Sequence, residues 1–504
     1  MAYPTLTQIR AEICKKDLAR FTKEAWHVVE PEYDLAWNWH IPAITDHLEA
    51  VTRQVIADPK DPGPKIQQLI VNIPPGHAKS IIVAVIWPAW EWLVHPTMRT
   101  LFASYALELA MRDSLRCRDL IKSEWYQEWF KPEWEIRGDA DAKKLFQNTA
   151  GGFRQCLSVG SATTGYRGDK IVGDDLLSVM EAESDTKRRE AGDFWLRAMP
   201  TRLNKRKTGA RMLIQQRVHE ADPTGLCLAK GGWEHLCLPS EFVPEKHCRT
   251  SIGFEDPRTE AGELLFEELF PREVLESDKV DMGSASYGAQ HGQNPTPAGG
   301  LIFQRRWWRY WQPKGANFPP VEVRVGDNEI VYVYPEDLPD DLDEILQSWD
   351  LTFKDHKDTD FVAGGVWGRK GAKAYLLDRI NARLSFTKTL TAIREMVRKW
   401  PKSGAILIED KANGPAVINT LSDEIAGIIP VEPDGGKLAR ANAVTPGIES
   451  GNAYLPHPML VDWIESYLAQ HDGFPKAAND DDVDQTTQAL RRIFARVSDS
   501  DWDC

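Results

Sequence analysis

The pattern of apolar and polar positions divides the chain into two series of short strands. Between about residue 66 and residue 240, apolar runs of strand length alternate with segments of helical periodicity. The runs are QQLIVNIP (67–74), RTLFASY (99–105), FRQCLSVGS (153–161), KIVGDD (170–175), ARMLIQQR (210–217) and WEHLCLP (233–239). This alternation of strand and helix predicts a mostly parallel, doubly wound sheet.

A second strand series follows a change of character. Residues 250–294 are charged and carry no matching strands, and QNPTPAGG (293–300) has the composition of a connector. After it come EILQSWDLTF (344–353), FVAGGVWG (361–368), KAYLLDRI (373–380), GAILIED (404–410) and GIIPVEP (427–433). We therefore expect two α/β domains, at residues 1–250 with an N-terminal helical segment and at residues 298–504, joined by a lid or linker region at 251–297.

Composition narrows the class of protein. Of 504 residues, 42% are hydrophobic and 10% aromatic, which excludes a fibrous or disordered chain. The formal net charge of -14 means that any attraction to nucleic acid has to come from a local basic patch. The seven cysteines form no CxxC pair, which favours a reducing compartment. The longest apolar stretch, Ile81–Val94, is too short to span a bilayer, and the N-terminus lacks the apolar region of a secretory signal, so we expect a soluble intracellular protein without membrane contact.

The first apolar run ends in a segment suited to phosphate. A Pro-Pro-Gly turn follows the run, and Lys79 and Ser80 then open a helical pattern. In such a unit, backbone N–H groups hold phosphate oxygens, the lysine reaches the β- and γ-phosphates and the serine hydroxyl helps to hold Mg²⁺. The usual GxxxxGK would place glycine at positions 73 and 78, where this chain has Ile73 and Ala78. Taken alone, the segment also fits coincidence.

A pair of acids at the end of a later strand strengthens this interpretation. Asp174 and Asp175 follow the run KIVG, where a doubly wound NTPase brings a metal-holding acid beside the phosphates. We expect Asp174 to hold Mg²⁺ and Asp175 to polarise the attacking water. The alternative is a solvated Asp-Asp turn, but the order and spacing of the two elements favour ATP hydrolysis.

Acidic residues also gather at strand ends in the second series. Asp350 ends ILQSWD, Glu409 and Asp410 end AILIED, and the helical pattern VDQTTQALRRIFAR is opened by Asp480, Asp481, Asp482 and Asp484. Three or four convergent carboxylates can hold two Mg²⁺ or Mn²⁺ ions about 4 Å apart and so act on a phosphodiester. Each acid alone fits a turn or helix-cap residue equally well. The strand period of two sends Glu409 and Asp410 to opposite faces, so only one of them should bind metal directly.

Basic residues concentrate in residues 186–217, where the local charge is +8. Such a segment suits contacts to nucleic-acid phosphates, and a solvated surface explains it equally well. QRRWWRYWQP (304–313) interleaves arginines with aromatic residues. It fits either a DNA-facing surface or interdomain packing with cation–π contacts.

Together, these motifs resemble the large terminase subunit of tailed bacteriophages over nearly the whole chain. PPGHAKS matches the family's Walker A loop, VGSATTGYRGDKIVGDD its Walker B region, IQQRVHEADPTG the coupling motif, and SWDLTFK, IEDKANGP and NDDDVDQ the nuclease segments. The resemblance implies an α/β protein with an N-terminal P-loop (ASCE-type) ATPase domain and a C-terminal RNase H-like nuclease domain. It implies a packaging motor that uses ATP to drive double-stranded DNA into the procapsid and cuts concatemeric DNA.

The resemblance also implies roles for single residues. The residues expected to bind ATP and its Mg²⁺ are Gly76, His77, Ala78, Lys79, Ser80, Asp174 and the coupling residue Gln216, with Asp175 as a catalytic residue. The nuclease would bind Mg²⁺ or Mn²⁺ through Asp350, Glu409 and Asp481, which are also its catalytic residues, with Asp410 and Asp484 as rivals or helpers.

The sequence departs from the family pattern in the Walker A loop, at the Walker B acid and in the coupling motif. Many large terminases carry an arginine inside the Walker A loop, and this loop has none, so we expect Arg167 to act on the site of a neighbouring subunit. Asp175 replaces the family's more frequent glutamate, and Gln215 and Gln216 stand where Thr or Ser often lies.

The implied partners are double-stranded DNA, the portal protein with the procapsid, the small terminase subunit, and further copies of the chain in a ring, expected to be a pentamer, on the portal. The implied location is the host cell cytoplasm and not the mature virion. Two other classes stay open: a DNA-translocating ATPase whose second domain only binds DNA, and a nonenzymatic capsid or scaffold protein. ATP turnover and metal-dependent DNA cutting would separate the three.

Overall fold

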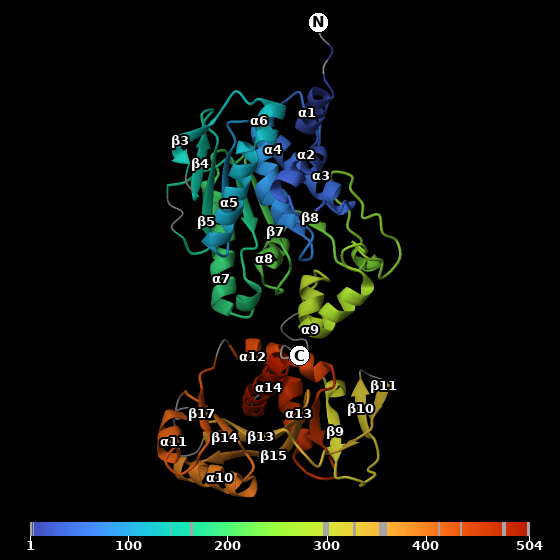
Figure 1. Ribbon diagram of the computed structural model, residues 1–504, viewed down its shortest axis with the longest axis vertical. Helices are drawn as coiled ribbons and strands as arrows, with labels where there is room; N and C mark the ends of the chain where they lie inside the picture. The colour runs from blue at the N-terminus through green and yellow to red at the C-terminus, as the bar shows by residue number, and fades with distance from the viewer. Residues whose placement is uncertain are drawn as a thin grey trace. The chain divides into compact units, whose positions relative to one another are not determined.

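Each strand series forms an eight-stranded sheet of its own (Figure 1). The structure, a computed structural model, describes residues 3, 5–141, 143–161, 165–295, 302–325, 329–351, 360–411, 414–433, 436–475 and 480–500. The chain divides into two units, residues 1–279 with 285–297, and residues 280–284 with 298–504. Part of the predicted connector, residues 296–300, lies outside the described residues.

The first unit begins with three helices and continues through the first sheet. Its elements are α1 (Leu6–Lys16), α2 (Leu18–Val29), α3 (His40–Ile56), β1 (Gln68–Asn72), η1 (Ile81–Ile86), α4 (Trp87–Val94), β2 (Arg99–Ser104), α5 (Leu107–Lys122), α6 (Glu124–Phe130), β3 (Ile136–Asp141), β4 (Leu145–Asn148), β5 (Phe153–Ser158), β6 (Lys170–Asp174), η2 (Val179–Glu181), α7 (Asp185–Asp193), η3 (Phe194–Ala198), η4 (Met199–Arg202), β7 (Ala210–Gln215), α8 (Pro223–Lys230), β8 (Glu234–Cys237), η5 (Pro244–Lys246) and α9 (Arg272–Gln290).

The order of strands in the first sheet is β3-β4-β5-β2-β6-β7-β1-β8. From β5 to β8 every pair is parallel, whereas β3 and β4 form an antiparallel extension that the sequence pattern does not predict. β7 lies between β1, which leads into the phosphate-loop segment, and β6, which ends at Asp174. One strand inserted between these two is the arrangement expected of an ASCE-type P-loop domain.

The second unit holds the remaining elements. They are η6 (Arg305–Trp307), β9 (Arg309–Gln312), β10 (Val321–Val325), β11 (Glu329–Val333), β12 (Glu336–Asp337), β13 (Glu344–Asp350), β14 (Asp360–Lys370), β15 (Lys373–Leu384), α10 (Phe386–Lys399), β16 (Ala405–Glu409), α11 (Gly414–Leu421), β17 (Ile428–Val431), α12 (Lys437–Glu449), β18 (Ala453–Pro456), α13 (Ile464–Gly473) and α14 (Asp481–Ser500).

The second sheet has the order β12-β9-β18-β15-β14-β13-β16-β17. β13, β14 and β15 pair antiparallel, and β13, β16 and β17 pair parallel. These five strands are the expected RNase H-like part of the sheet. Residues of α14 pack on one face of it and residues of α10 and α11 on the other, so both faces are covered. The observed topologies of the two sheets agree with the predicted fold class.

The aromatic segment 304–313 belongs to the core of the second unit. Trp308 and Tyr310 are almost fully buried, and Arg305 forms ion pairs with Asp472 and Glu465. These rings therefore fill the interior of their own unit and do not offer a surface for DNA.

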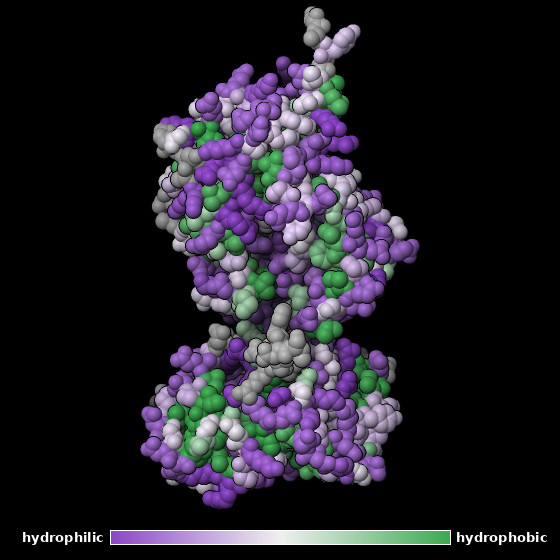
Figure 2. All heavy atoms as spheres, in the orientation of Figure 1, coloured by the Kyte–Doolittle hydropathy of each residue, from purple (hydrophilic) through white to green (hydrophobic). Residues whose placement is uncertain are grey.

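The outer surface of both units is mainly hydrophilic on the face shown in Figure 2, with apolar residues in smaller groups. Among the described residues, no helix has the length and apolar character needed to cross a membrane.

Candidate functional site

The phosphate-loop segment leaves β1 at the carboxyl edge of the first sheet. β1 is a buried strand between β7 and β8, so the chain has to turn sharply where it ends. Gly76 takes a φ of +79°, and a Cβ on it would lie 2.4 Å from the ring of Phe270, so this position requires glycine. Ala78 has a φ of +56° at the position where the usual loop has its second glycine.

Three neighbouring strand ends bring the predicted ATPase residues together. Lys79 and Ser80 follow β1, Asp174 ends β6, and Gln216 follows β7. The Ser80 hydroxyl donates to Asp174 at 3.2 Å. Lys79 Nζ lies 3.5 Å from Gln216 Oε1 and 3.6 Å from Asp175 Oδ2. Because adjacent parallel strands end at the same edge of a sheet, residues far apart in sequence meet at one place.

Asp174 is electrostatically unfavourable as a carboxylate in this setting. Burial raises its pKa to about 7, and the charges of Asp175 and Asp113 act in the same direction. Lys79 and the Ser80 hydroxyl oppose this shift. The carboxylate and the hydroxyl are oxygen donors of the kind that Mg²⁺ prefers. The residues present therefore fit a divalent ion, whose charge would favour the ionised form of Asp174.

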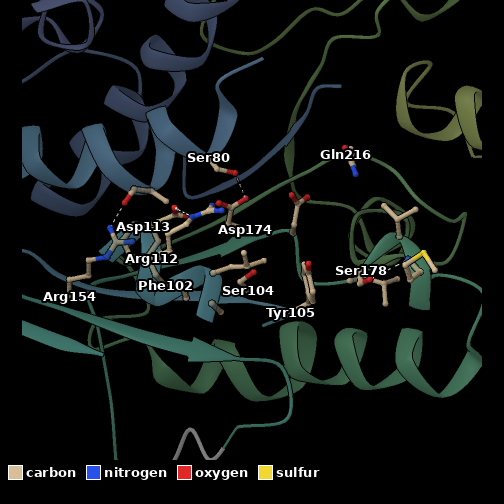
Figure 3. Close-up of a pocket in the computed structure, with 18 residues that line it drawn as sticks. Ser80, Phe102, Ser104, Tyr105, Arg112, Asp113, Arg154, Asp174, Ser178 and Gln216 are labelled. Atoms are coloured by element: carbon tan, nitrogen blue, oxygen red, sulfur yellow. Dashed lines mark hydrogen bonds and ion pairs between the residues drawn. The ribbon is translucent and has the colours of Figure 1, made fainter. Parts of the chain in front are cut away.

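Two cavities open on these residues. The larger, of about 700 Å³, is bounded by residues 75–81 of the loop and by apolar side chains that include Trp26, Tyr33, Ile41 and Phe266. Its size and apolar wall suit a nucleobase beside the phosphate loop. The smaller, of about 360 Å³, extends from Ser80 and Asp174 along β2 and α5 (Figure 3).

His77 is a buried part of the loop. Its ring stacks on Phe270 with the ring centroids 4.7 Å apart, and burial lowers its pKa to about 4. The imidazole is therefore neutral at neutral pH, and the backbone N–H is the group of His77 that suits a phosphate oxygen.

Arg167 lies at the opposite edge of the first sheet from the acids. It precedes β6, whose five residues lead to Asp174, and its guanidinium donates to Thr201 O at 3.5 Å. A strand of that length spans about 16 Å. Arg167 therefore does not reach the acids of its own chain, and its action on a neighbouring subunit stays a prediction.

Sequence reasoning missed the side chains that line the smaller cavity on the α5 side. Arg112 and Asp113 come from the first half of α5, and Arg154 comes from β5. The sequence signal for Arg112 and Asp113 is an Arg-Asp pair in the helix that follows β2, the strand next to β6. Such pairs are common on solvated helices, so the sequence alone did not single them out.

In the second unit, Asp350 and Glu409 end neighbouring parallel strands. The register pairs Trp349 of β13 with Ile408 of β16, so the two acids stand side by side one position later. Asp350 is buried, with 3% of its surface exposed, and Glu409 is half-buried. The structure therefore places two of the predicted metal ligands at one strand edge.

The pleat of these strands distinguishes Glu409 from Asp410. Leu346 of β13 and Leu407 of β16 belong to the core cluster that contains residues of α14. Side chains two positions apart share a face, so Asp350 and Glu409 lie on the α14 side of the sheet. Asp410 is one position later, so its side chain leaves the backbone on the opposite face of the sheet.

The first acids of α14 differ in their surroundings. Asp482 is fully buried and forms an ion pair with Arg379 and a 2.8 Å hydrogen bond with Asn381. Asp481 is half-buried, and burial together with the charge of Asp480 raises its pKa. The ion pair and the hydrogen bond therefore satisfy Asp482 within the fold.

Asp484 shares a cavity of about 340 Å³ with Glu409. Two cations of α12 hold it: Lys437 Nζ lies 2.5 Å away and Arg440 Nη2 2.6 Å away. Asp481 is not among the residues that line this cavity. Across the described part of the chain, no three Asp, Glu, His or Cys side chains form a group that could hold a metal ion. The structure thus brings Asp350 together with Glu409, and Glu409 together with Asp484.

The basic segment at residues 186–217, which suits contacts to nucleic-acid phosphates, does not form a single surface. Arg217 is buried in an ion pair with Asp222, and the guanidinium of Arg211 lies 4.9 Å from the ring centroid of Trp233. Residues 205–207 are exposed in the loop before β7. Part of the +8 charge therefore stabilises the fold, and the rest is open to solvent.

Comparison with known proteins shows which protein family the second unit resembles. Residues 347–492 match the family model described as the terminase RNaseH-like domain. The match confirms the resemblance to large terminase subunits and, together with the strand orders of both sheets, the predicted fold class.

Several solved terminase structures are similar to this chain. A large terminase from a thermophilic bacteriophage is 10% identical, with 89% of this chain and 98% of that chain covered and a TM-score of 0.46. The nuclease domain of the large terminase from bacteriophage SPP1, with bound Mn, is 19% identical, with 30% and 87% covered and a TM-score of 0.24. The large terminase nuclease from thermophilic phage G20c, with bound magnesium, is 13% identical, with 39% and 96% covered and a TM-score of 0.27. No curated protein matches the chain.

Proposed function

We propose that this protein is the ATPase and nuclease of a viral DNA-packaging motor. It hydrolyses ATP to move double-stranded DNA into a procapsid and cuts concatemeric DNA with divalent metal ions. The observation that carries the proposal is the union in one chain of a region that matches the terminase RNaseH-like family model with a sheet of ASCE-type strand order. At the edge of that sheet Ser80 contacts Asp174 and Lys79 contacts Asp175. Nucleotide would occupy the cavity of about 700 Å³ beside the loop.

The ATPase residues have separable tasks. The water oxygen forms a bond to the γ-phosphorus while the bond from that phosphorus to the bridging oxygen breaks, and the electron pair stays on ADP. Asp175 orients the water and takes its proton, and Lys79 holds the β- and γ-phosphates. Gln216 contacts Lys79 and follows β7, so it can transmit the state of the phosphates to that strand. Bound Mg²⁺ would supply further neutralisation of the phosphate charge.

The nuclease residues are proposed from the strand edge of the second unit. Asp350 and Glu409 would hold Mg²⁺ or Mn²⁺ together with an acid of α14. Asp484 suits this third position better than Asp481 because it shares the cavity with Glu409. Lys437 and Arg440 form ion pairs with Asp484, and a metal ion would compete with them for its oxygens.

The proposed setting follows from this function. The motor would assemble as a ring, proposed to be a pentamer, on the portal protein of the procapsid in the host cell cytoplasm. The small terminase subunit would be a further partner, and double-stranded DNA the substrate of both units.

A pair of variants tests the two activities in one preparation. Lys79→Ala should abolish ATP turnover and leave plasmid cutting in Mg²⁺ or Mn²⁺ unchanged, because the two sites are built from separate units. Asp350→Ala should abolish plasmid cutting and leave ATP turnover unchanged. Lys65→Ala, an exposed lysine before β1, is the matched control and should change neither activity.

The outcomes separate the alternatives. ATP turnover without cutting would favour a DNA-translocating ATPase whose second domain only binds DNA. The observation that favours this alternative is the absence of a three-acid metal-binding group among the described residues. Neither activity would favour a scaffold protein. Normal ATP turnover in Lys79→Ala would refute the ATPase site.

A further inference from the structure

This inference rests on the proposed ATPase and concerns an arginine that its phosphate loop lacks. In phosphoryl transfer, negative charge spreads over the oxygens of the transferred group, and an arginine commonly stabilises it. Residues 73–80 contain no arginine. Among the residues described as lining the two cavities on the site, the arginines are Arg112 and Arg154.

Arg154 is fixed within the core. It is 1% exposed, its guanidinium lies 3.8 Å from the ring centroid of Phe102, and it donates to the carbonyl of Ala84 in η1. To reach a bound phosphate, the guanidinium of Arg154 would have to move off the Phe102 ring and give up its hydrogen bond to the Ala84 carbonyl. Arg154 therefore supports η1, which follows the phosphate loop, through its bond to Ala84.

Arg112 has the opposite character. Its side chain is 57% exposed at the mouth of the cavity, and its Nε donates to Asp113 Oδ1 at 2.9 Å. Asp113 is 4% exposed, so the hydrogen bond ties the exposed guanidinium to a buried carboxylate. Figure 3 shows the Arg112 side chain extending between Asp113 and Asp174. The hydrogen bond to Asp113, and then the charges of Asp113 and Asp174, raise the pKa of Arg112.

We propose that Arg112 is the charge-stabilising arginine of the ATPase and acts on the γ-phosphate bound to its own chain, with Asp113 as its positioning residue. As the bond from the γ-phosphorus to the bridging oxygen breaks, the terminal nitrogens of Arg112 donate to the γ-phosphoryl oxygens. The contact with Asp113 uses Nε and so keeps the guanidinium oriented during this step. Arg112 thereby takes the role that the sequence assigned to Arg167.

Kinetics of single variants test this role. Arg112→Ala should lower kcat for ATP on the order of 10³-fold. Its affinity for ATP-γ-S, measured by calorimetry, should change less than about threefold, because the interaction belongs to the transition state. Arg112→Lys should retain more turnover than Arg112→Ala. The matched control is Arg118→Ala, on the same helix and also followed by an aspartate, Asp119, at 3.4 Å, and it should turn over ATP normally.

Mixing inactive variants distinguishes action within a chain from action between chains. If Arg112 serves its own chain, a mixture of Arg112→Ala with Lys79→Ala should recover no ATP turnover under conditions of assembly. Recovery would show that Arg112 acts on a neighbour and would overturn the proposal, as would a normal kcat in Arg112→Ala. If instead Arg167→Ala is inactive and is rescued by Lys79→Ala, the charge comes from Arg167 of a neighbouring subunit. Normal turnover in Lys79→Ala alone would refute the ATPase itself, so the two failures remain distinguishable.

Discussion

Glu409 and Asp410 carry the same charge at adjacent positions, and the strand separates them. Glu409 shares its face with Leu407, which packs toward α14, and stands beside Asp350 of β13. Asp410 donates its backbone N–H to Val431 O at 2.8 Å and turns its side chain away from that face. At the residue scale, one step along the chain therefore decides which of the two acids lies on the same face as Asp350, where the metal ion is proposed to bind.

This difference predicts unequal effects of three conservative variants. Asp350→Asn and Glu409→Gln should each stop plasmid cutting in Mg²⁺ and in Mn²⁺, because each removes a charged ligand while keeping the shape of the side chain. Asp410→Asn should cut within about threefold of the parent rate. A gel assay with all three proteins checks this, with ATP turnover as the control for folding. Loss of cutting in Asp410→Asn alone would reverse the assignment.

At the scale of elements, the basic segment (186–217) runs from the carboxyl ends of the parallel strands of the first sheet to their amino ends. α7 follows the end of β6, at the edge that carries Asp174, and the loop at 204–209 leads into the start of β7 at the opposite edge. The bridge between Gly168 and Leu203 places Arg167 beside this loop. The exposed charges of Arg167 and residues 205–207 therefore form a basic patch far along the strands from the ATPase acids.

If this patch binds DNA, its removal should change the salt dependence of binding. Reversing the charge at Lys205, Arg206 and Lys207 should lower the slope of log K against log salt by about 0.9 for each DNA phosphate that the protein no longer neutralises. Lys187→Glu with Arg189→Glu on α7 is the comparison, since these residues lie toward the other edge. Binding to duplex DNA measured at several salt concentrations decides the matter, and an unaltered slope would leave the patch as a solvated surface.

At the scale of the whole molecule, each unit encloses histidines in its own core. Burial lowers the pKa of His40 to about 3 and those of His77, His235 and His471 to about 4. Below pH 6.5 the unfolded chain binds a proton at each of these residues, whereas the folded chain stays neutral there until near pH 4. Each such histidine therefore makes the free energy of unfolding fall as the pH falls from 6.5 toward 4.

His471 gives a direct test in the second unit. Its N–H donates to Tyr467 O at 2.9 Å within a fully buried environment, so protonation in place is strongly opposed. In urea unfolding at pH 7, 6 and 5, the free energy of unfolding of His471→Gln should lose about 1.4 kcal/mol less per pH unit than that of the parent below pH 6.5. His27→Gln, an exposed histidine, should follow the parent. Parallel pH profiles for His471→Gln and the parent would contradict the assignment.

Local patterns in the sequence determined much of this protein. The strand period and the turn residues predict the six parallel strands of the first sheet and the five strands of the RNase H-like part. The Lys79–Ser80 segment and the acids at strand ends follow from the same patterns. These features are encoded within a few consecutive residues, because strand pleat, loop chemistry and helix starts depend on neighbours along the chain.

Only the tertiary structure decided which of these groups meet. The strand order places β7 between β1 and β6 and so brings Gln216 to Lys79, and α5 brings Arg112 and Asp113 to the side of Asp174. Packing likewise separates Glu409 from Asp410, pairs Asp482 with Arg379, buries Arg217 of the basic segment and places Arg211 against Trp233. These contacts join residues far apart in sequence, and they depend on strand order and side-chain packing, which no local pattern encodes.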